Sequence, residues 1–306
     1  MARLSVPGNL LLLGEYAVVE TGGLGIALAI EPRVSATARG TAAASLIGIS
    51  SGGETRWPGD GGLLSAIVSS VTALLAGRGV RELPPAEVRI DSRSLRKGYG
   101  SSAAVAVAAS AMLLVLAGLE GDDLVFATSH AALTAHRAFQ GGRGSGYDVA
   151  ASLHGGIGLF EGGEEPAWTP VPLDWIGPLA VFGGRSPVAT SGAVATYQEW
   201  KRSDPAAASD FLAASNRAVA GFASAQGWGE AAPWFEAARA LGLELGRAIG
   251  VSARIKPPEA WGGDRGGLYK AVGAGNELGV LAGAQGEAAA AVLRIAAAGL
   301  TIEEKA

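Results

Sequence analysis

The chain lacks cysteine entirely, and its 306 residues include only three histidines. The absence of thiols excludes disulfides, cysteine nucleophiles and cysteine-ligated zinc, and it is typical of proteins from the reducing cytoplasm. The histidines, His130, His136 and His154, do not have the spacing of a zinc site, so packing or surface roles are favoured for them. We therefore expect a cytoplasmic protein whose chemistry uses no thiols.

Basic patches and long apolar runs are also missing. The formal net charge is -4, which gives no electrostatic footprint for nucleic acid. Only residues 103–119 approach membrane length, and they are rich in alanine and follow a glycine turn, which favours a buried helix. The apolar run at residues 10–13 is too short for the core of a signal peptide. We expect no nucleic-acid partner and no membrane partner.

Two common phosphate-binding signatures are absent. The chain has no Gly-Lys dipeptide, which excludes a Walker lysine, and no Gly-x-Gly-x-x-Gly in a strand–turn–helix setting. Residues 100–104 approach the Gly-x-Ser-x-Gly elbow of serine hydrolases, with Asp148 and His154 downstream in triad order. However, Ala104 replaces the last glycine, and His154 follows Asp148 by only six residues, so a hydrolase is disfavoured.

A glycine-rich loop is the most informative feature that is present. Residues 98–104 read Gly-Tyr-Gly-Ser-Ser-Ala-Ala and lead into the alanine-rich segment. A helix that begins at these serines offers unpaired N–H groups and its dipole to phosphate oxygens, and Lys97 adds a cation. Taken alone, the loop is equally compatible with a phosphate cradle and with a serine-capped buried helix.

Asp148 directly follows a second glycine-rich loop, residues 141–146, and begins an apolar, helix-like run. A carboxylate in this position can lie near bound phosphates and accept a proton from a substrate hydroxyl. It can equally cap the helix, because aspartate is a preferred N-cap residue. The residues alone leave both interpretations open.

The periodicity of apolar residues predicts a mixture of strands and helices. Strands are expected at residues 10–13, 17–19, 26–30, 34–37, 87–90, 155–160, 179–182 and 280–281. Helices are expected at residues 63–75, 103–119, 124–138, 191–201, 206–224, 232–249 and 285–298. Residues 161–172 are rich in Gly, Glu and Pro and lack periodicity, which predicts a domain boundary and two domains, 1–168 and 169–306.

Three segments of the chain resemble, in the same order along the sequence, the three motifs of the GHMP small-molecule kinases. Residues 6–19, which include Val-Pro-Gly-Asn-Leu and Gly-Glu-Tyr-Ala-Val-Val, resemble the first motif, residues 98–104 the phosphate-binding motif, and residues 270–277 the third. Residues 14–20, 140–150 and 184–190 are most similar to the phosphomevalonate kinase branch. The resemblance extends over nearly the whole chain.

The resemblance implies an α+β, two-domain GHMP kinase fold, with a ribosomal S5 domain 2-like N-terminal domain, a ferredoxin-like C-terminal domain and the active cleft between them. It also implies transfer of the γ-phosphoryl group of ATP, with Mg²⁺, to a small-molecule acceptor. In the phosphomevalonate branch of isoprenoid biosynthesis the acceptor is itself a phosphate and the product a diphosphate. The oligomeric state expected from the family is a monomer or a homodimer.

The family's residue roles transfer to matching positions. ATP phosphates would contact Lys97, Gly98, Tyr99, Gly100, Ser101, Ser102 and Ala103, and Ser102 would also approach Mg²⁺. Asp148 would be the catalytic carboxylate, and Asn9 occupies the position of a catalytic residue. The acceptor would contact Glu15, Tyr16, Ser145, Gly146, Tyr147, Arg185, Thr190, Gly273 and Ala274.

Several positions depart from the family pattern, and Asn9 and Arg137 matter most for the chemistry. Asn9 stands where the family usually has a lysine, and loss of such a charge typically costs about 3 kcal/mol of transition-state stabilisation. Lys97, Arg143, Arg185 and Lys270 are candidate replacement cations. Arg137 stands where mevalonate kinases carry a magnesium-binding glutamate, which argues against a mevalonate kinase. The alternatives are therefore a phosphomevalonate kinase, a GHMP kinase for another acceptor, and a nucleotide- or metabolite-binding protein with little turnover.

Overall fold

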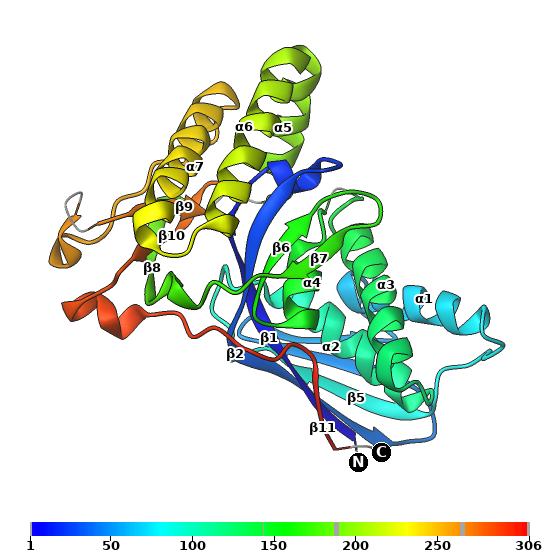
Figure 1. The fold of residues 1–306 in the computed structure, drawn as a ribbon. Helices are drawn as coiled ribbons and strands as arrows, with labels where there is room; N and C mark the ends of the chain where they lie inside the picture. Colours follow the sequence, from blue (N-terminus) through cyan, green and yellow to red (C-terminus); the bar gives the residue numbers. More distant parts are fainter. Residues whose placement is uncertain (1, 143, 187–189, 264–266, 305–306) are drawn as a thin grey trace. The chain divides into compact units, whose positions relative to one another are not determined.

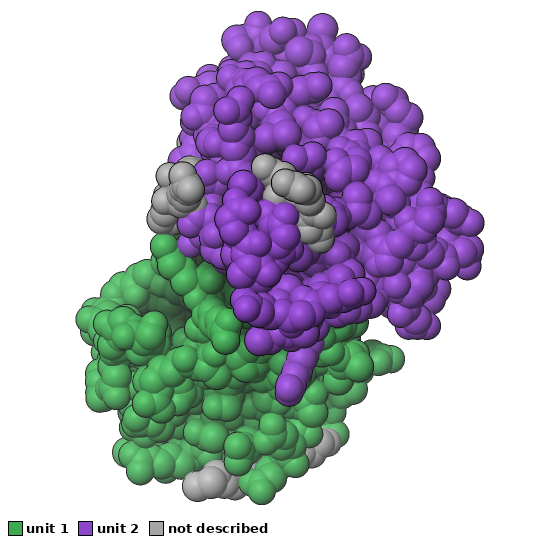
Figure 2. Space-filling model, turned by 90° about the vertical axis from the view of Figure 1, so that its left-hand side faces the viewer, with its two compact units in different colours: residues 1–9, 29–156, 295–306 green, residues 10–28, 157–294 purple. Residues whose placement is uncertain are grey.

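The computed structural model of the chain describes residues 2–142, 144–186, 190–263 and 267–304, and for residues 185, 186, 190 and 191 only the backbone. The chain divides into two units, each built from separate segments (Figure 2). Unit 1 comprises Met1–Asn9, Ala29–Gly156 and Ile295–Ala306, and unit 2 comprises Leu10–Leu28 and Ile157–Arg294. Strands β1 (Ala2–Leu13) and β2 (Leu24–Gly40) contribute residues to both units.

The sheet of unit 1 is built around the second half of β2. Its strand order is β11-β1-β2-β5-β3-β4, where β3 spans Ser45–Ser50, β4 Gly53–Trp57, β5 Ala86–Asp91 and β11 Thr301–Glu304. The β2–β5 pair is antiparallel, with Ala36 opposite Ile90, and the β3–β5 pair is parallel, with Leu46 opposite Val88. All four of these side chains are buried, so alternate residues of each strand face the core.

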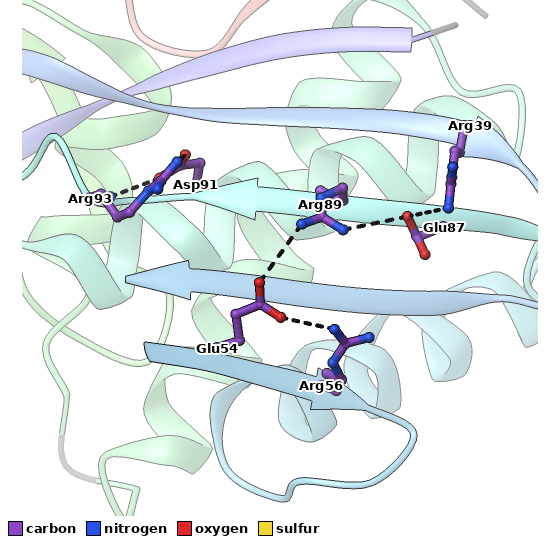
Figure 3. Close-up of polar contacts among 7 residues, drawn as sticks. All are labelled: Arg39, Glu54, Arg56, Glu87, Arg89, Asp91 and Arg93. Atoms are coloured by element: carbon purple, nitrogen blue, oxygen red, sulfur yellow. Dashed lines mark hydrogen bonds and ion pairs between the residues drawn. The ribbon is translucent and has the colours of Figure 1, made fainter. Parts of the chain in front are cut away.

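The intervening residues of these strands form a charged face (Figure 3). Arg39 pairs with Glu87 at 3.0 Å, Arg56 with Glu54 at 2.9 Å, and Arg93 with Asp91 at 2.5 Å; Arg89 lies 3.7 Å from Glu87 and 3.9 Å from Glu54. Ion pairs at this exposure contribute little to stability, because water screens them. These ion pairs mark the face of the sheet that lies opposite the apolar core.

Four helices pack on the apolar face of this sheet (Figure 1). They are α1 (Leu63–Ala76), α2 (Ser101–Leu116), α3 (Gly121–Phe139) and α4 (Tyr147–His154). α2 contacts all three of the others and is buried continuously from Ala106 to Leu114, because its many alanines let neighbours approach on every side. The predicted buried helix is confirmed. Within the described residues, no helix combines the length and apolarity needed to cross a membrane.

Unit 2 contains an antiparallel sheet of order β8-β10-β9 and three long helices. The strands are β8 (Leu179–Ser186), β9 (Tyr269–Val272) and β10 (Asn276–Ala282), and the helices are α5 (Thr190–Ser203), α6 (Pro205–Ser224) and α7 (Trp228–Ala248). β6 (Ile157–Glu161) pairs with the first half of β2 and with β7 (Ala167–Pro170). Asp204 caps α6 by accepting a hydrogen bond from the N–H of Ala207.

Two sequence-based assignments are wrong. Residues 17–19 form a 3₁₀ turn, η1 (Ala17–Val19), rather than a strand. The predicted helix at 285–298 is a short 3₁₀ helix, η5 (Gly286–Ala291), followed by irregular chain that forms single bridges, Ala180 with Val292 and Ile30 with Ile295. Alanine favours helices locally, but here backbone pairing with neighbouring strands prevails.

Candidate active site

The phosphate-binding loop predicted from the sequence lies between β5 and α2 in unit 1. Gly98 and Gly100 have positive φ angles of 84° and 67°, a conformation that glycine adopts without strain. A Cβ atom at Gly100 would lie 2.1 Å from the side-chain oxygen of Asn9, and a Cβ at Gly8 would lie 2.7 Å from the carbonyl oxygen of Tyr99. The backbone of β1 therefore passes so close to the loop that both positions require glycine.

Asn9 holds this loop in place. Its side chain is buried, with 2% of its surface exposed. Its Nδ2 donates to the carbonyl oxygen of Gly100 at 3.2 Å and to Oγ of Ser152 in α4 at 2.9 Å, and its backbone N–H donates to Tyr99 at 3.1 Å. The amide thus connects β1, the loop and α4. Its predicted catalytic role stays a prediction.

The N-terminus of α2 is open to a ligand. The N-cap residue is Gly100 rather than a serine, and no side chain caps the helix. The interpretation of residues 98–104 as a serine-capped helix is therefore wrong. The first N–H groups of a helix have no acceptor within it, and the helix dipole favours an anion there. Because Ser101 and Lys97 are also exposed, this donor set fits the phosphates of a nucleotide.

A chain of polar contacts lies behind the loop. Asp148 lies in the first turn of α4, and its Oδ2 is 3.4 Å from Nδ1 of His136. His136 belongs to α3 and is only 1% exposed. Nε2 of the same imidazole lies 3.0 Å from Oγ of Ser102 in α2. From the sequence, a packing or surface role was predicted for His136. Its contact with Asp148 and Ser102 depends on the packing of three helices, and no local pattern indicates it.

Electrostatics favour the charged forms of Asp148 and His136. Burial opposes both charges, but the attraction between the two groups outweighs it, so the pKa of Asp148 is lowered and the pKa of His136 is raised. As an imidazolium, His136 donates from both nitrogens, to Asp148 and to Ser102. In that form the hydroxyl proton of Ser102 would be free for a phosphate oxygen, and the imidazolium would be a cation behind the loop.

The second glycine-rich loop is held by Arg137 of α3. Its Nε donates to the carbonyl oxygen of Gly144 and its Nη2 to that of Ser145, both at 3.0 Å. Ser145 and Gly146 are buried, and Tyr147 begins α4. The arginine that replaces the mevalonate-kinase glutamate thus orders the chain that leads into Asp148. Arg143 lies outside the described residues.

The chemistry of these groups also fits Mg²⁺. Among the described residues no cluster of three His, Asp or Glu side chains could hold a metal ion by itself. Magnesium at nucleotide sites is commonly held by one or two protein oxygens together with substrate phosphates. Ser102 and Asp148, which His136 connects, are suitable oxygen donors for that arrangement.

The alternative hydrolase triad is not formed, since six residues of helix place His154 about 9 Å along the axis from Asp148.

In unit 2, Glu15 forms a buried ion pair with Lys270. Nζ of Lys270 also donates to the carbonyl oxygens of Leu12 at 2.9 Å and Ala271 at 2.7 Å. Burial raises the pKa of Glu15, and the ammonium of Lys270 offsets this only in part. Because its three donors and its charge already have partners, Lys270 is not a free replacement cation.

Tyr16 is strained. It is the only non-glycine residue of the described chain with a positive φ, 64°, and such strain often marks functional sites. Burial and the nearby Glu15 raise its pKa to about 12. Tyr16, Glu15 and Gly273 line one cavity of unit 2.

Gly273 and Ala274 lie in the β9–β10 turn that carries the third motif. Arg185 lies in β8 and Thr190 begins α5, but their side chains are outside the described residues.

Comparisons with known proteins agree with this arrangement. Residues 65–156 match the family model of the GHMP kinases N terminal domain. A mevalonate kinase of Aeropyrum pernix is 32% identical over 174 residues, which are 54% of this chain and 52% of that protein. The chain therefore aligns with about half the length of this curated relative.

Two solved structures share the fold over almost the whole chain. The Lin0012 protein of Listeria innocua superposes with a TM-score of 0.81 at 20% identity and covers 99% of both chains. The phosphomevalonate kinase of Streptococcus pneumoniae, in complex with phosphomevalonate and AMPPNP, superposes with a TM-score of 0.71 at 20% identity and covers 95% of this chain and 94% of its own. Residues 65–156 thus match the N-terminal domain of the GHMP kinases, and the chain shares the fold of these structures, which agrees with the resemblance and confirms the α+β fold class.

Proposed function

We propose that the chain is an ATP-dependent kinase that phosphorylates a small-molecule acceptor, and that the acceptor is phosphomevalonate. The reaction moves the γ-phosphoryl group of ATP to an acceptor oxygen and releases ADP. The uncapped N-terminus of α2 and the family match support the use of ATP. The complex of the Streptococcus pneumoniae relative supports the choice of acceptor.

The ion pair of Asp148 and His136 carries the proposal. A general base works best when its pKa lies near the working pH, and the pKa of Asp148 is lowered instead. Asp148 is therefore held as a carboxylate beside His136. A phosphate acceptor needs no such base, because its second pKa is about 6 and it is already largely ionised at neutral pH. Asp148 would then serve to orient the acceptor and the metal.

The remaining chain residues supply position and charge. The N–H groups at Ser101, Ser102 and Ala103 would hold phosphate oxygens, with Lys97 beside them. Ser102 and Asp148 would hold Mg²⁺, which neutralises phosphate charge when bound. His136 supplies a cation behind the loop and thereby compensates in part for the neutral Asn9. Catalysis of this kind rests on positioning and electrostatic stabilisation.

A mevalonate kinase is the second candidate, because the curated relative from Aeropyrum pernix has that name. Its acceptor would be an alcohol, whose proton Asp148 would have to accept while it is paired with His136. Arg137, which holds the loop before Asp148, also leaves no carboxylate at the position of the mevalonate-kinase glutamate.

A coupled ADP-release assay with phosphomevalonate, mevalonate, sugars and amino alcohols separates these functions. We expect turnover with phosphomevalonate and a diphosphate product by mass spectrometry. Asp148→Asn should lower kcat by at least about 100-fold, whereas Asp122→Asn, an exposed carboxylate at the start of α3, should leave it unchanged. Turnover of mevalonate alone would favour the second candidate. Binding of ATP without ADP release from any acceptor would indicate a binding protein.

A further inference from the structure

The chain returns to unit 1 along a segment that packs against the helix carrying Asp148. We call residues 295–304 the return segment, because the chain leaves unit 1 after Gly156 and re-enters it at Ile295. The segment ends in β11, which pairs with β1, and Figure 1 draws it in red. Before it reaches β11, it lies against the last turn of α4.

The contact between the return segment and α4 is made backbone to backbone. The N–H of Leu300 donates to the carbonyl oxygen of Leu153 at 2.9 Å, which gives an acceptor of the last helical turn the partner that the helix itself cannot supply. The N–H of Gly156 donates to the carbonyl oxygen of Ala296 at 2.8 Å. A Cβ atom at Gly299 would clash with the carbonyl oxygen of Leu153, so no side chain fits between the two segments.

Arg33, in β2, holds the return segment in this position. Its Nη1 donates to the carbonyl oxygen of Ala298 at 2.9 Å, and its Nη2 donates to the carbonyl oxygen of Gly299 and, at 3.1 Å, to Oγ1 of Thr301. The guanidinium also donates to Ser5 of β1, from Nε to Oγ at 3.0 Å and from Nη2 to the carbonyl oxygen at 3.2 Å. The planar group thus joins β2, β1 and the return segment in one fixed geometry.

Helix α4 carries two side chains of the candidate site. Asp148 lies 3.4 Å from Nδ1 of His136, and Ser152 accepts a hydrogen bond from the amide of Asn9. Because α4 has only eight residues, it moves as one rigid body, and a displacement at Leu153 reaches Asp148, about 7.5 Å away along the axis. The position of Asp148 therefore depends on what holds the far end of the helix.

We propose that Arg33 is a positioning residue of the kinase site: it fixes the return segment, the return segment fixes the last turn of α4, and α4 holds Asp148 in place for the reaction. The inference rests on the proposed function, since it takes Asp148 to orient the acceptor and the metal. All of these contacts lie within unit 1. Catalysis by positioning depends on such support, because a displacement of about 1 Å can cost about 100-fold in rate.

Two variants disturb the support at different points, and each has a matched control. Arg33→Met removes the donors to the return segment, whereas Arg3→Met removes an exposed ion pair with Glu303, farther along that segment than its contact with α4. Gly299→Ala adds a Cβ against α4 without removing a hydrogen bond, and Gly40→Ala adds one where no atom lies within 4 Å. Neither glycine has a positive φ, so the two differ only in the space available.

Hydrogen exchange of the amides of α4, with α1 as the internal reference, tests the support without any substrate. We expect Arg33→Met and Gly299→Ala to exchange about 3- to 10-fold faster in α4 and at the wild-type rate in α1. In the kinase assay both should lower kcat by about 10- to 100-fold with little change in the KM for ATP, because the N–H groups that would hold the phosphates belong to α2. The two controls should match the wild type.

Thermal melting verifies that each variant is folded. If Arg33→Met is not, Thr301→Val, which removes only one acceptor of the guanidinium, takes its place. Exchange in α4 that matches the controls, an equal increase in α1 and α4, or an unchanged kcat in an active enzyme overturns the inference. If the wild type releases no ADP with any acceptor, the proposed function fails, and the exchange of α4 alone decides whether Arg33 and Gly299 hold the helix.

Discussion

The contact of His136 with Asp148 leads to a sharp prediction about stability. Removing one partner of a buried ion pair usually costs 3–5 kcal/mol. The lower end applies here, because the two groups are 3.4 Å apart and the Asp148 side chain is 14% exposed. We therefore expect His136→Leu to lower the free energy of unfolding by about 3 kcal/mol, which corresponds to a decrease in Tm of about 6–12 °C for a protein of this size.

The pH dependence of this effect follows from the two pKa shifts. His136 has a folded pKa above its ordinary value of 6.5, so its contribution is fully present below that pH and is lost as the pH rises through the folded pKa. Asp148 has a folded pKa below its ordinary value of 3.8, so its contribution is present above that pH and is lost as the pH falls through the folded pKa. The stabilisation is therefore greatest between about pH 4 and pH 6.5.

Thermal unfolding of the wild type and His136→Leu at pH 5.5 and pH 9 measures this difference. His130→Leu, at an exposed position of the same helix, is the control and should change Tm little at either pH. His136→Asn and His136→Gln separate the two contacts, since their amide nitrogens approximate the positions of Nδ1 and Nε2. A Tm difference that is the same at both pH values, or no larger than that of the control, would refute an ionised pair.

Three further predictions concern the loop and the buried pair of unit 2. Gly100→Ala should destabilise by more than Gly79→Ala in thermal unfolding, because both glycines have positive φ but only the first would place a Cβ against Asn9. Asn9→Lys should lower Tm, because it buries an ammonium and removes both amide hydrogen bonds, and an equal or higher Tm would contradict this role. Lys270→Met should cost about 3–5 kcal/mol in urea unfolding, and adding Glu15→Gln should restore part of that loss, because no unpaired carboxylate then remains.

The parts of the site that could be predicted from the sequence are those whose chemistry is local. The glycine turn at residues 98–100, the helix that follows it and the carboxylate after the second glycine-rich loop are each encoded within about ten residues. Long, periodic helices such as α1, α6 and α7 were predicted for the same reason. Short elements were predicted less accurately. The strands β3, β4 and β9 were not predicted, and the alanine-rich segment at 285–298 was predicted as an α-helix but contains only a short 3₁₀ helix.

Local pattern therefore predicted the glycine turn at residues 98–100, the candidate carboxylate Asp148 and the mixed α+β character of the chain, because turn geometry and side-chain periodicity are properties of neighbouring residues. Tertiary packing alone brought His136 between Asp148 and Ser102, gave both donors of Asn9 acceptors on other segments, and placed the return segment against α4. These contacts join residues far apart in sequence, and the burial and charge that shift their pKa values exist only once the chain is folded.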